Sequence, residues 1–68
     1  MREKGIIKRY LEARGFGFIS RTGAPDAFFH CREVYSEDPE RTIQAGASVE
    51  FEVQLTEKGL QAVNVVFL

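Results

Sequence analysis

Alternating apolar and polar residues show that part of this chain forms a half-buried β-strand. Apolar residues occupy every second position from Val49 to Leu55, and Glu50, Glu52 and Gln54 lie between them. A period of two sends alternate side chains to opposite faces of a strand, so that one face is buried and the other meets water. No segment shows the sustained period of 3.6 that an amphipathic helix requires. The chain is therefore predicted to be all-β.

Five short strands are predicted, separated by residues that favour turns. The predicted strands cover residues 4–11, 15–20, 27–31, 49–55 and 60–68. Turn residues connect them at 12–13, 22–26 and 57–59, and residues 32–46 are polar and irregular, with one helical turn at most. The expected core consists of Ile7, Ile19, Phe29, Val49, Phe51, Val53, Val63 and Val65. Short strands of this kind are expected to form a closed antiparallel barrel, which leaves no sheet edge unpaired.

Residues 1–68 are expected to form one domain, near the lower size limit for folding without disulfides or a metal. Cys31 is the single cysteine and cannot form an internal disulfide. Together with the one histidine, His30, it falls short of the four ligands of a structural zinc site. No nucleophile or paired carboxylate accompanies His30, so an enzyme is not expected. No signal peptide or membrane span is found, and a cytoplasmic monomer without a cofactor is expected.

Two runs of the chain each place two rings on one strand face. The rings are Phe16 and Phe18 in the first run, and Phe28 and His30 in the second. Gly15 and Gly17 flank Phe16, and their missing side chains are expected to let a flat partner approach the backbone. Proteins bind single-stranded nucleic acid by stacking unpaired bases on such rings. The spacing therefore predicts a stacking surface on two adjacent strands, although the phenylalanines could also belong to the core.

The charges are divided unevenly along the chain, although the net charge is only −1. Up to residue 32 there are seven basic and three acidic residues, whereas the remainder has two basic and seven acidic residues. A polyanion responds to the local field rather than to the total charge. The basic half also contains the ring-bearing runs, and at least two of Lys8, Arg9 and Arg14 are expected to contact phosphate.

Four ordered blocks of the chain resemble the bacterial cold-shock domain, a five-stranded OB-fold barrel. The family patterns are Gly-x-Val-Lys-Trp-Phe-Asn, Lys-Gly-Phe-Gly-Phe-Ile, Asp-x-Phe-Val-His-Phe and Lys-Gly-Pro-x-Ala-x-Asn-Val. The corresponding blocks here are residues 5–11, 14–19, 26–31 and 58–65. The resemblance covers nearly the whole chain in the right order and spacing. It implies an all-β, five-stranded antiparallel OB-fold barrel that binds nucleic acid.

The resemblance and the charge pattern together define a candidate binding set. Its members are Lys8, Arg9, Tyr10, Arg14, Phe16, Phe18, Phe28, His30 and Lys58. Three positions depart from the family: Arg9 replaces a stacking Trp, Cys31 replaces a stacking Phe, and Glu40 lies near a loop position that is often Phe. Each stacked base contributes roughly 1–3 kcal/mol, so weaker and more salt-sensitive binding is expected. Arg9 can recover part of the loss by stacking its guanidinium and pairing with phosphate.

The expected partner is single-stranded RNA or DNA, bound with little sequence preference, and the protein is a candidate for keeping RNA from refolding. One alternative is a barrel whose surface has diverged into a protein-interaction module. Another is the N-terminal domain of a longer membrane-tethered protein, which the apolar ending Val65–Leu68 suggests. Tyr35 is a candidate to replace a missing loop aromatic residue. Cys31 is interpreted as a tolerated substitution in preference to a redox sensor.

Overall fold

The computed structural model describes residues 2–36 and 42–68 and confirms the all-β prediction. Its elements are β1 (Glu3–Leu11), β2 (Phe16–Arg21), β3 (Ala24–His30), the 3₁₀ turn η1 (Cys31–Glu33), β4 (Val34–Tyr35), β5 (Ser48–Thr56) and β6 (Gly59–Phe67). The five long strands correspond to the five predicted ones. One helical turn is found, as predicted, but η1 begins at Cys31, which was predicted to end the third strand, and the two-residue strand β4 follows it directly.

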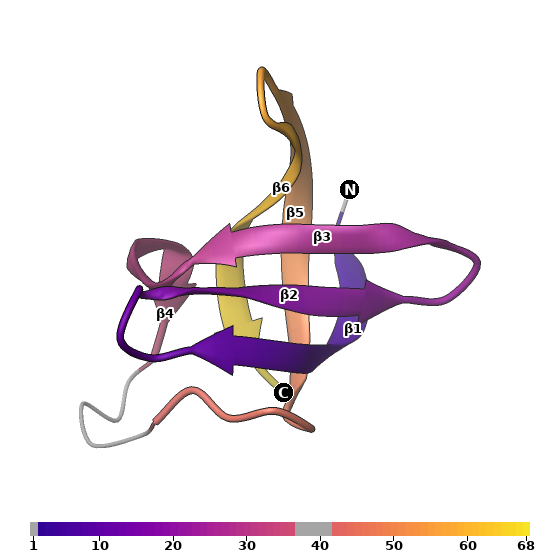
Figure 1. Cartoon of the computed structure of the whole chain (residues 1–68). Helices are drawn as coiled ribbons and strands as arrows, with labels where there is room; N and C mark the ends of the chain where they lie inside the picture. Colours follow the sequence, from indigo (N-terminus) through magenta and orange to yellow (C-terminus); the bar gives the residue numbers. More distant parts are fainter. Residues whose placement is uncertain (1, 37–41) are drawn as a thin grey trace.

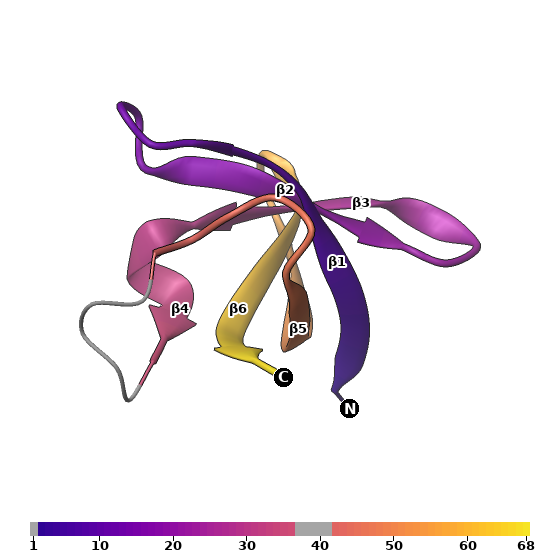
Figure 2. The same ribbon diagram turned by 90° about the horizontal axis from the view of Figure 1, so that it is seen from below.

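The strands close into a barrel of two crossed layers. Their hydrogen-bonded order is β3-β2-β1-β5-β6-β4, and a parallel pairing between β3 and β6 closes the ring. The first half of β1 pairs with β5 and the second half with β2, so β1 belongs to both layers. Figure 1 shows β1, β2 and β3 crossing in front of β5 and β6, and Figure 2 shows the two layers from below. One face of the β1–β3 layer is therefore turned away from the barrel interior.

The turn between β2 and β3 is shorter than predicted. Only Thr22 and Gly23 lie outside the strands, and β3 already begins at Ala24. The pairing register slips between Ile19 and Arg21, because β3 carries one residue more than β2 over the stretch from Ala27 to Ala24. A bulge accommodates Pro25, which has no N–H to give to the ladder. The predicted turn at 22–26 was therefore wrong in its second half.

The barrel interior is filled by apolar side chains from all five long strands. The buried residues are Ile7, Ile19, Ala27, Phe29, Val49, Phe51, Ala62 and Val65. Val53 is half-buried and packs against this core, whereas the prediction of Val63 as a core residue is wrong. Glu50 pairs with Val66 and Glu52 with Val63, so β6 has one residue more than β5 over this stretch, and Asn64 adopts a left-handed φ of 52°. This bulge turns Ala62 and Val65 inward in place of Val63.

Candidate nucleic-acid interface

A bulge in β1 directs two consecutive basic side chains outward. Ile7 pairs with Ile19, and the next pair is Arg9 with Phe18, so β1 has one residue more than β2 at Lys8–Arg9. Ile7 is buried, whereas Lys8 and Arg9 are both exposed. In a regular strand Arg9 would lie on the same face as Ile7 and point into the core. The bulge therefore places Arg9 on the outer face.

Three phenylalanine rings form a cluster on this outer face. The ring centroids of Phe16 and Phe28 are 5.3 Å apart, those of Phe18 and Phe28 are 5.9 Å apart, and those of Phe16 and Phe18 are 6.2 Å apart. All three residues are half-buried. Their neighbours along the strands that point inward, Gly17 on β2 and Ala27 and Phe29 on β3, are fully buried. The rings therefore lie outside the core, as the spacing predicted. Edge-to-face and tilted contacts hold them in place and leave ring surface open to solvent.

Cross-strand pairing extends this cluster into two rows. Arg9 pairs with Phe18, Phe18 with Phe28, and Phe28 with Gln61 of β6. The second row runs from Leu11 through Phe16 to His30. Directly opposite residues have Cβ atoms about 4.5–5.5 Å apart, so each row is continuous. Gln61 was missed by the sequence analysis, because only the closure of the barrel brings β6 beside β3.

The two glycines beside Phe16 have structural roles that differ from the predicted one. Gly17 is buried, and a Cβ atom there would lie 2.3 Å from the carbonyl oxygen of Arg9 and 2.9 Å from the Phe29 ring. Gly15 has a φ of +75°, and a Cβ atom would lie 3.2 Å from the Cys31 sulfur. Gly17 therefore allows the core to pack, and Gly15 provides a left-handed backbone after the β1–β2 turn. The inward position of Gly17 contradicts the interpretation that its missing side chain serves the approach of a ligand.

Tyr10 does not join the three-ring cluster. Its ring stacks on the buried Phe29, with centroids 6.0 Å apart and the planes inclined by 12°. Burial raises the pKa of the Tyr10 hydroxyl above 10.0. Cys31 raises this pKa further, through its charge and through a hydrogen bond between its side chain and Tyr10, and the charge of Glu12 adds to the effect. The β1 bulge explains this position, because it turns Tyr10 toward the core together with Ile7. A direct contact between Tyr10 and nucleic acid stays a prediction.

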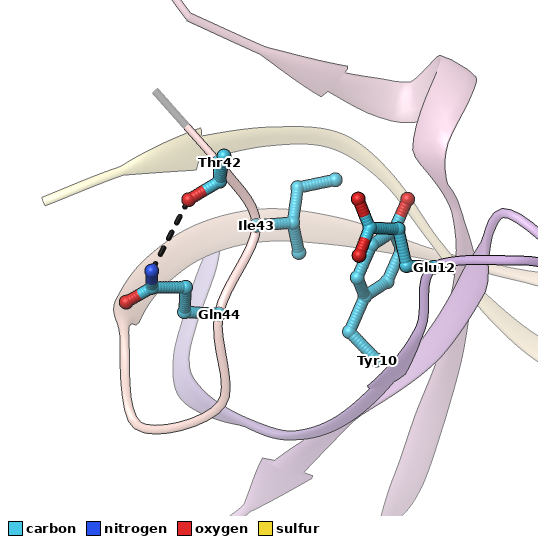
Figure 3. A pocket seen from close by; sticks show the side chains of 5 residues that line it. All are labelled: Tyr10, Glu12, Thr42, Ile43 and Gln44. Carbon is cyan, nitrogen blue, oxygen red and sulfur yellow. Dashed lines mark hydrogen bonds between the residues drawn. The ribbon is translucent and has the colours of Figure 1, made fainter. Parts of the chain in front are cut away.

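A hollow of about 490 Å³ lies beside Tyr10. Figure 3 shows its lining side chains: Tyr10 and Glu12 come from the end of β1 and the turn after it, and Thr42, Ile43 and Gln44 from the segment before β5. The Gln44 side chain donates a hydrogen bond to the Thr42 hydroxyl at 3.2 Å. Tyr10 and Ile43 both pack against the core. The hollow therefore lies at the margin of the core, between the end of β1 and the segment before β5.

The predicted basic residues differ in how firmly they are held. Lys8 forms an ion pair with Asp26 at 3.1 Å, with 64% of the lysine side chain exposed. Such an exposed pair contributes at most about 1 kcal/mol, so phosphate can compete for the lysine. Arg9 and Arg14 are exposed and have no side-chain partner in residues 2–36 or 42–68. Lys58 lies in the turn of the β5–β6 hairpin, which projects beyond β3 in Figure 1.

His30 and Cys31 lie at the end of the second row. The backbone N–H of Arg32 donates a hydrogen bond of 3.2 Å to Nδ1 of His30, which caps η1. Because Nδ1 accepts this bond, the proton of the neutral ring lies on Nε2. The Cys31 sulfur is 3.7 Å from the same Nδ1. Nε2 is therefore the ring atom that can donate a hydrogen bond to a ligand.

Two further sequence expectations concern loop residues. Tyr35 is 53% exposed and lies on β4, where it pairs with Val66. It has no ring contact with the three-phenylalanine cluster within the described part of the chain. Glu40, and the acidic run 37–40 around it, lie outside the described residues.

The barrel, the outer ring cluster and the sequence all point to one family. The family model described as the "cold-shock" DNA-binding domain matches residues 3–68, so this chain belongs to the cold-shock domain family. Proteins of this family in general bind nucleic acid and are not enzymes. The predicted resemblance is thereby confirmed.

Individual relatives extend the match over most of both chains. The chain is 46% identical over 65 residues to the cold shock-like protein CspG of Shewanella violacea, covering 94% of this chain and 91% of the relative. It is 39% identical over 66 residues to the cold shock protein CspA of Staphylococcus haemolyticus, covering 97% and 98%. Among solved structures, Drosophila Unr CSD456 superposes with a TM-score of 0.81 at 38% identity. All of this chain is covered, and it spans 27% of that longer chain.

Two other findings concern metals and membranes. Within residues 2–36 and 42–68, no group of three or more His, Cys, Asp or Glu side chains could hold a metal ion. In the same part of the chain, no helix has the length and apolar character needed to cross a membrane. The apolar ending that suggested a membrane tether belongs largely to β6, which pairs with β5 on one side and β4 on the other.

Proposed function

We propose that this protein binds single-stranded RNA or DNA with little sequence preference, and that it acts by holding strands unpaired. The observation that carries the proposal is the mutual contact of Phe16, Phe18 and Phe28 on the outer face of the β1–β3 layer. Every base has a flat face, so stacking on such rings tolerates any sequence. A strand whose bases are stacked on protein cannot pair with another strand, which is the physical basis of an RNA chaperone.

Basic side chains near the rings supply attraction to the backbone. Arg9 lies in the same cross-strand row as Phe18 and Phe28, and Lys8 is its neighbour on the bulge. Arg14 lies in the turn that joins β1 to β2. Each phosphate neutralised by such a residue releases counterions, so affinity is expected to fall as salt rises. His30 and Lys58 complete the proposed contacts, and Tyr10 supports the surface through its stacking on Phe29.

A titration of labelled oligo-dT and oligo-U at two salt concentrations tests this function. We expect both to bind, with a dissociation constant that rises steeply between the low and the high salt concentration. The matched control is Arg32→Gln, which removes an exposed positive charge in η1 rather than beside the rings. It should change the affinity less than Arg9→Gln does. Failure of both oligonucleotides to bind, even at low salt, would overturn the proposal and favour the protein-interaction alternative.

A further inference from the structure

We propose that Arg9 makes this protein prefer a guanine at the position of the base that stacks on Phe18. The inference rests on the proposed function and adds to it a preference at one base position, while the other stacking positions keep little sequence preference. It starts from one juxtaposition: Arg9 and Phe18 are directly paired across β1 and β2, and both side chains lie on the outer face.

Arg9 is available for a ligand, unlike Arg2 and Arg21. Arg2 and Arg21 are each fixed by an ion pair with a carboxylate of a neighbouring strand. Arg9 has neither a hydrogen bond nor an ion pair with its side chain among residues 2–36 and 42–68, and the bulge directs it away from the core. Its guanidinium therefore remains a free planar donor group at the edge of the ring cluster.

The position of Arg9 suits the edge of a stacked base more than its face. A base on Phe18 lies above the ring, and Arg9 arises from the neighbouring strand about 5 Å to the side. The long arginine side chain can then rise to the level of the base and meet its edge. The other neighbour in the row, Phe28, lies on the opposite side of Phe18, with its ring plane inclined by 71° to the Phe18 ring. The guanidinium of Arg9 can therefore lie beside one edge of a base that is stacked on Phe18.

The chemistry of the fork selects among the bases. An arginine fork donates two parallel hydrogen bonds and therefore needs two adjacent acceptors. Guanine offers O6 and N7, the most common specific partner of arginine in nucleic-acid recognition. Adenine places an amino donor beside N7, and thymine and uracil have an N–H between their two carbonyls. Cytosine offers N3 and O2, but its single ring has less surface to stack on the Phe18 ring than a purine has. Guanine is therefore the base that both offers two adjacent acceptors to the guanidinium and stacks two fused rings on Phe18.

Competition between oligonucleotides that differ in one base tests this inference. The probes are oligo-dT and the same strand with one central guanine, adenine, cytosine or 7-deazaguanine, which keeps the guanine rings but lacks N7. We expect the guanine strand to bind roughly 5- to 150-fold more tightly than oligo-dT, the range that corresponds to a bidentate pair. The 7-deazaguanine strand should lose a large part of that gain.

Variants of Arg9 separate base recognition from charge. Arg9→Lys keeps the positive charge but not the planar fork, so it should still bind oligo-dT and lose the preference for guanine. Arg32→Lys is the matched control on an exposed arginine of η1, outside the proposed contacts, and it should keep the preference. A thermal melt of each variant confirms that it is folded.

The outcomes distinguish this inference from the function on which it rests. If guanine and 7-deazaguanine strands bind equally, or if Arg9→Lys retains the guanine preference, Arg9 contacts phosphate only and the inference is wrong. A stronger gain from cytosine would also overturn it. In each of these cases binding to oligo-dT would leave the proposed function intact. Absence of binding to every strand would overturn both.

Discussion

The guanidinium of Arg2 donates a hydrogen bond of 2.8 Å to the main-chain carbonyl of Asn64, the left-handed residue of the β6 bulge. The same side chain donates to the backbone of Glu50 at 3.1 Å and forms an ion pair with its carboxylate at 2.7 Å. Arg2 therefore ties the start of the chain to β5 and β6 at the place where their register changes.

This geometry predicts that Arg2→Ala lowers the free energy of unfolding by about 1 kcal/mol, because two backbone carbonyls and the carboxylates of Glu50 and Glu52 lose their partner. Chemical denaturation at low and moderate salt measures the change. Arg32→Ala is the control, since it removes an exposed arginine that has no side-chain partner within the described residues. Equal effects of the two substitutions would mean that only the net charge matters.

Gly17→Ala is expected to destabilise the protein by about 2 kcal/mol or more, because the new methyl group overlaps the Arg9 carbonyl and the Phe29 ring. Ser20→Ala, at an exposed position of the same strand, should change the stability by less than about 0.5 kcal/mol. The midpoints of urea denaturation provide the comparison. A stable Gly17→Ala protein that binds oligonucleotides poorly would instead restore the predicted role of Gly17 in ligand approach.

The raised pKa of Tyr10 predicts a loss of stability in alkali. The folded state holds the phenolic proton of Tyr10 more tightly than the unfolded state, in which the pKa of this hydroxyl is near 10.0. The protonated hydroxyl therefore makes its full contribution to the free energy of unfolding below about pH 10. This contribution to the free energy of unfolding is lost as the pH rises through the higher pKa that Tyr10 has in the folded state. Tyr10→Phe removes the titrating group and should flatten the fall in unfolding free energy above pH 10. Parallel curves for the two proteins over that range would contradict the predicted shift.

Phe18→Ala is expected to weaken binding of oligo-dT by about 1–3 kcal/mol, the contribution of one stacked base. It should also lower the stability by about 1 kcal/mol, because Phe18 contacts both other rings of the cluster. Leu55→Ala is the control on a side chain that is 82% exposed and lies outside the cluster, and it should alter neither quantity appreciably. If Phe18→Ala unfolded the protein while leaving the affinity of the folded fraction unchanged, Phe18 would have a purely structural role.

Local patterns in the sequence were sufficient for the strands and for the ring cluster. The alternation from Val49 to Leu55 predicted β5, because side chains on a strand have a period of two whatever the strand pairs with. The same rule predicted that Phe16 and Phe18 share a face, and it placed Phe28 on the matching face of the next strand. These relationships lie within single strands or between two strands joined by a short turn.

The tertiary structure decided where that period is interrupted and what lies across from each strand. One additional residue at Lys8–Arg9 turns Arg9 outward and Tyr10 inward, and one at Asn64 buries Ala62 in place of Val63. A bulge depends on how two strands pair, so neither strand encodes it in its own alternation. Gln61 reaches Phe28 only because the barrel closes, across a long separation in the chain. The ring spacing was therefore determined by the sequence alone, whereas the polar neighbours of the rings depend on how the strands pair.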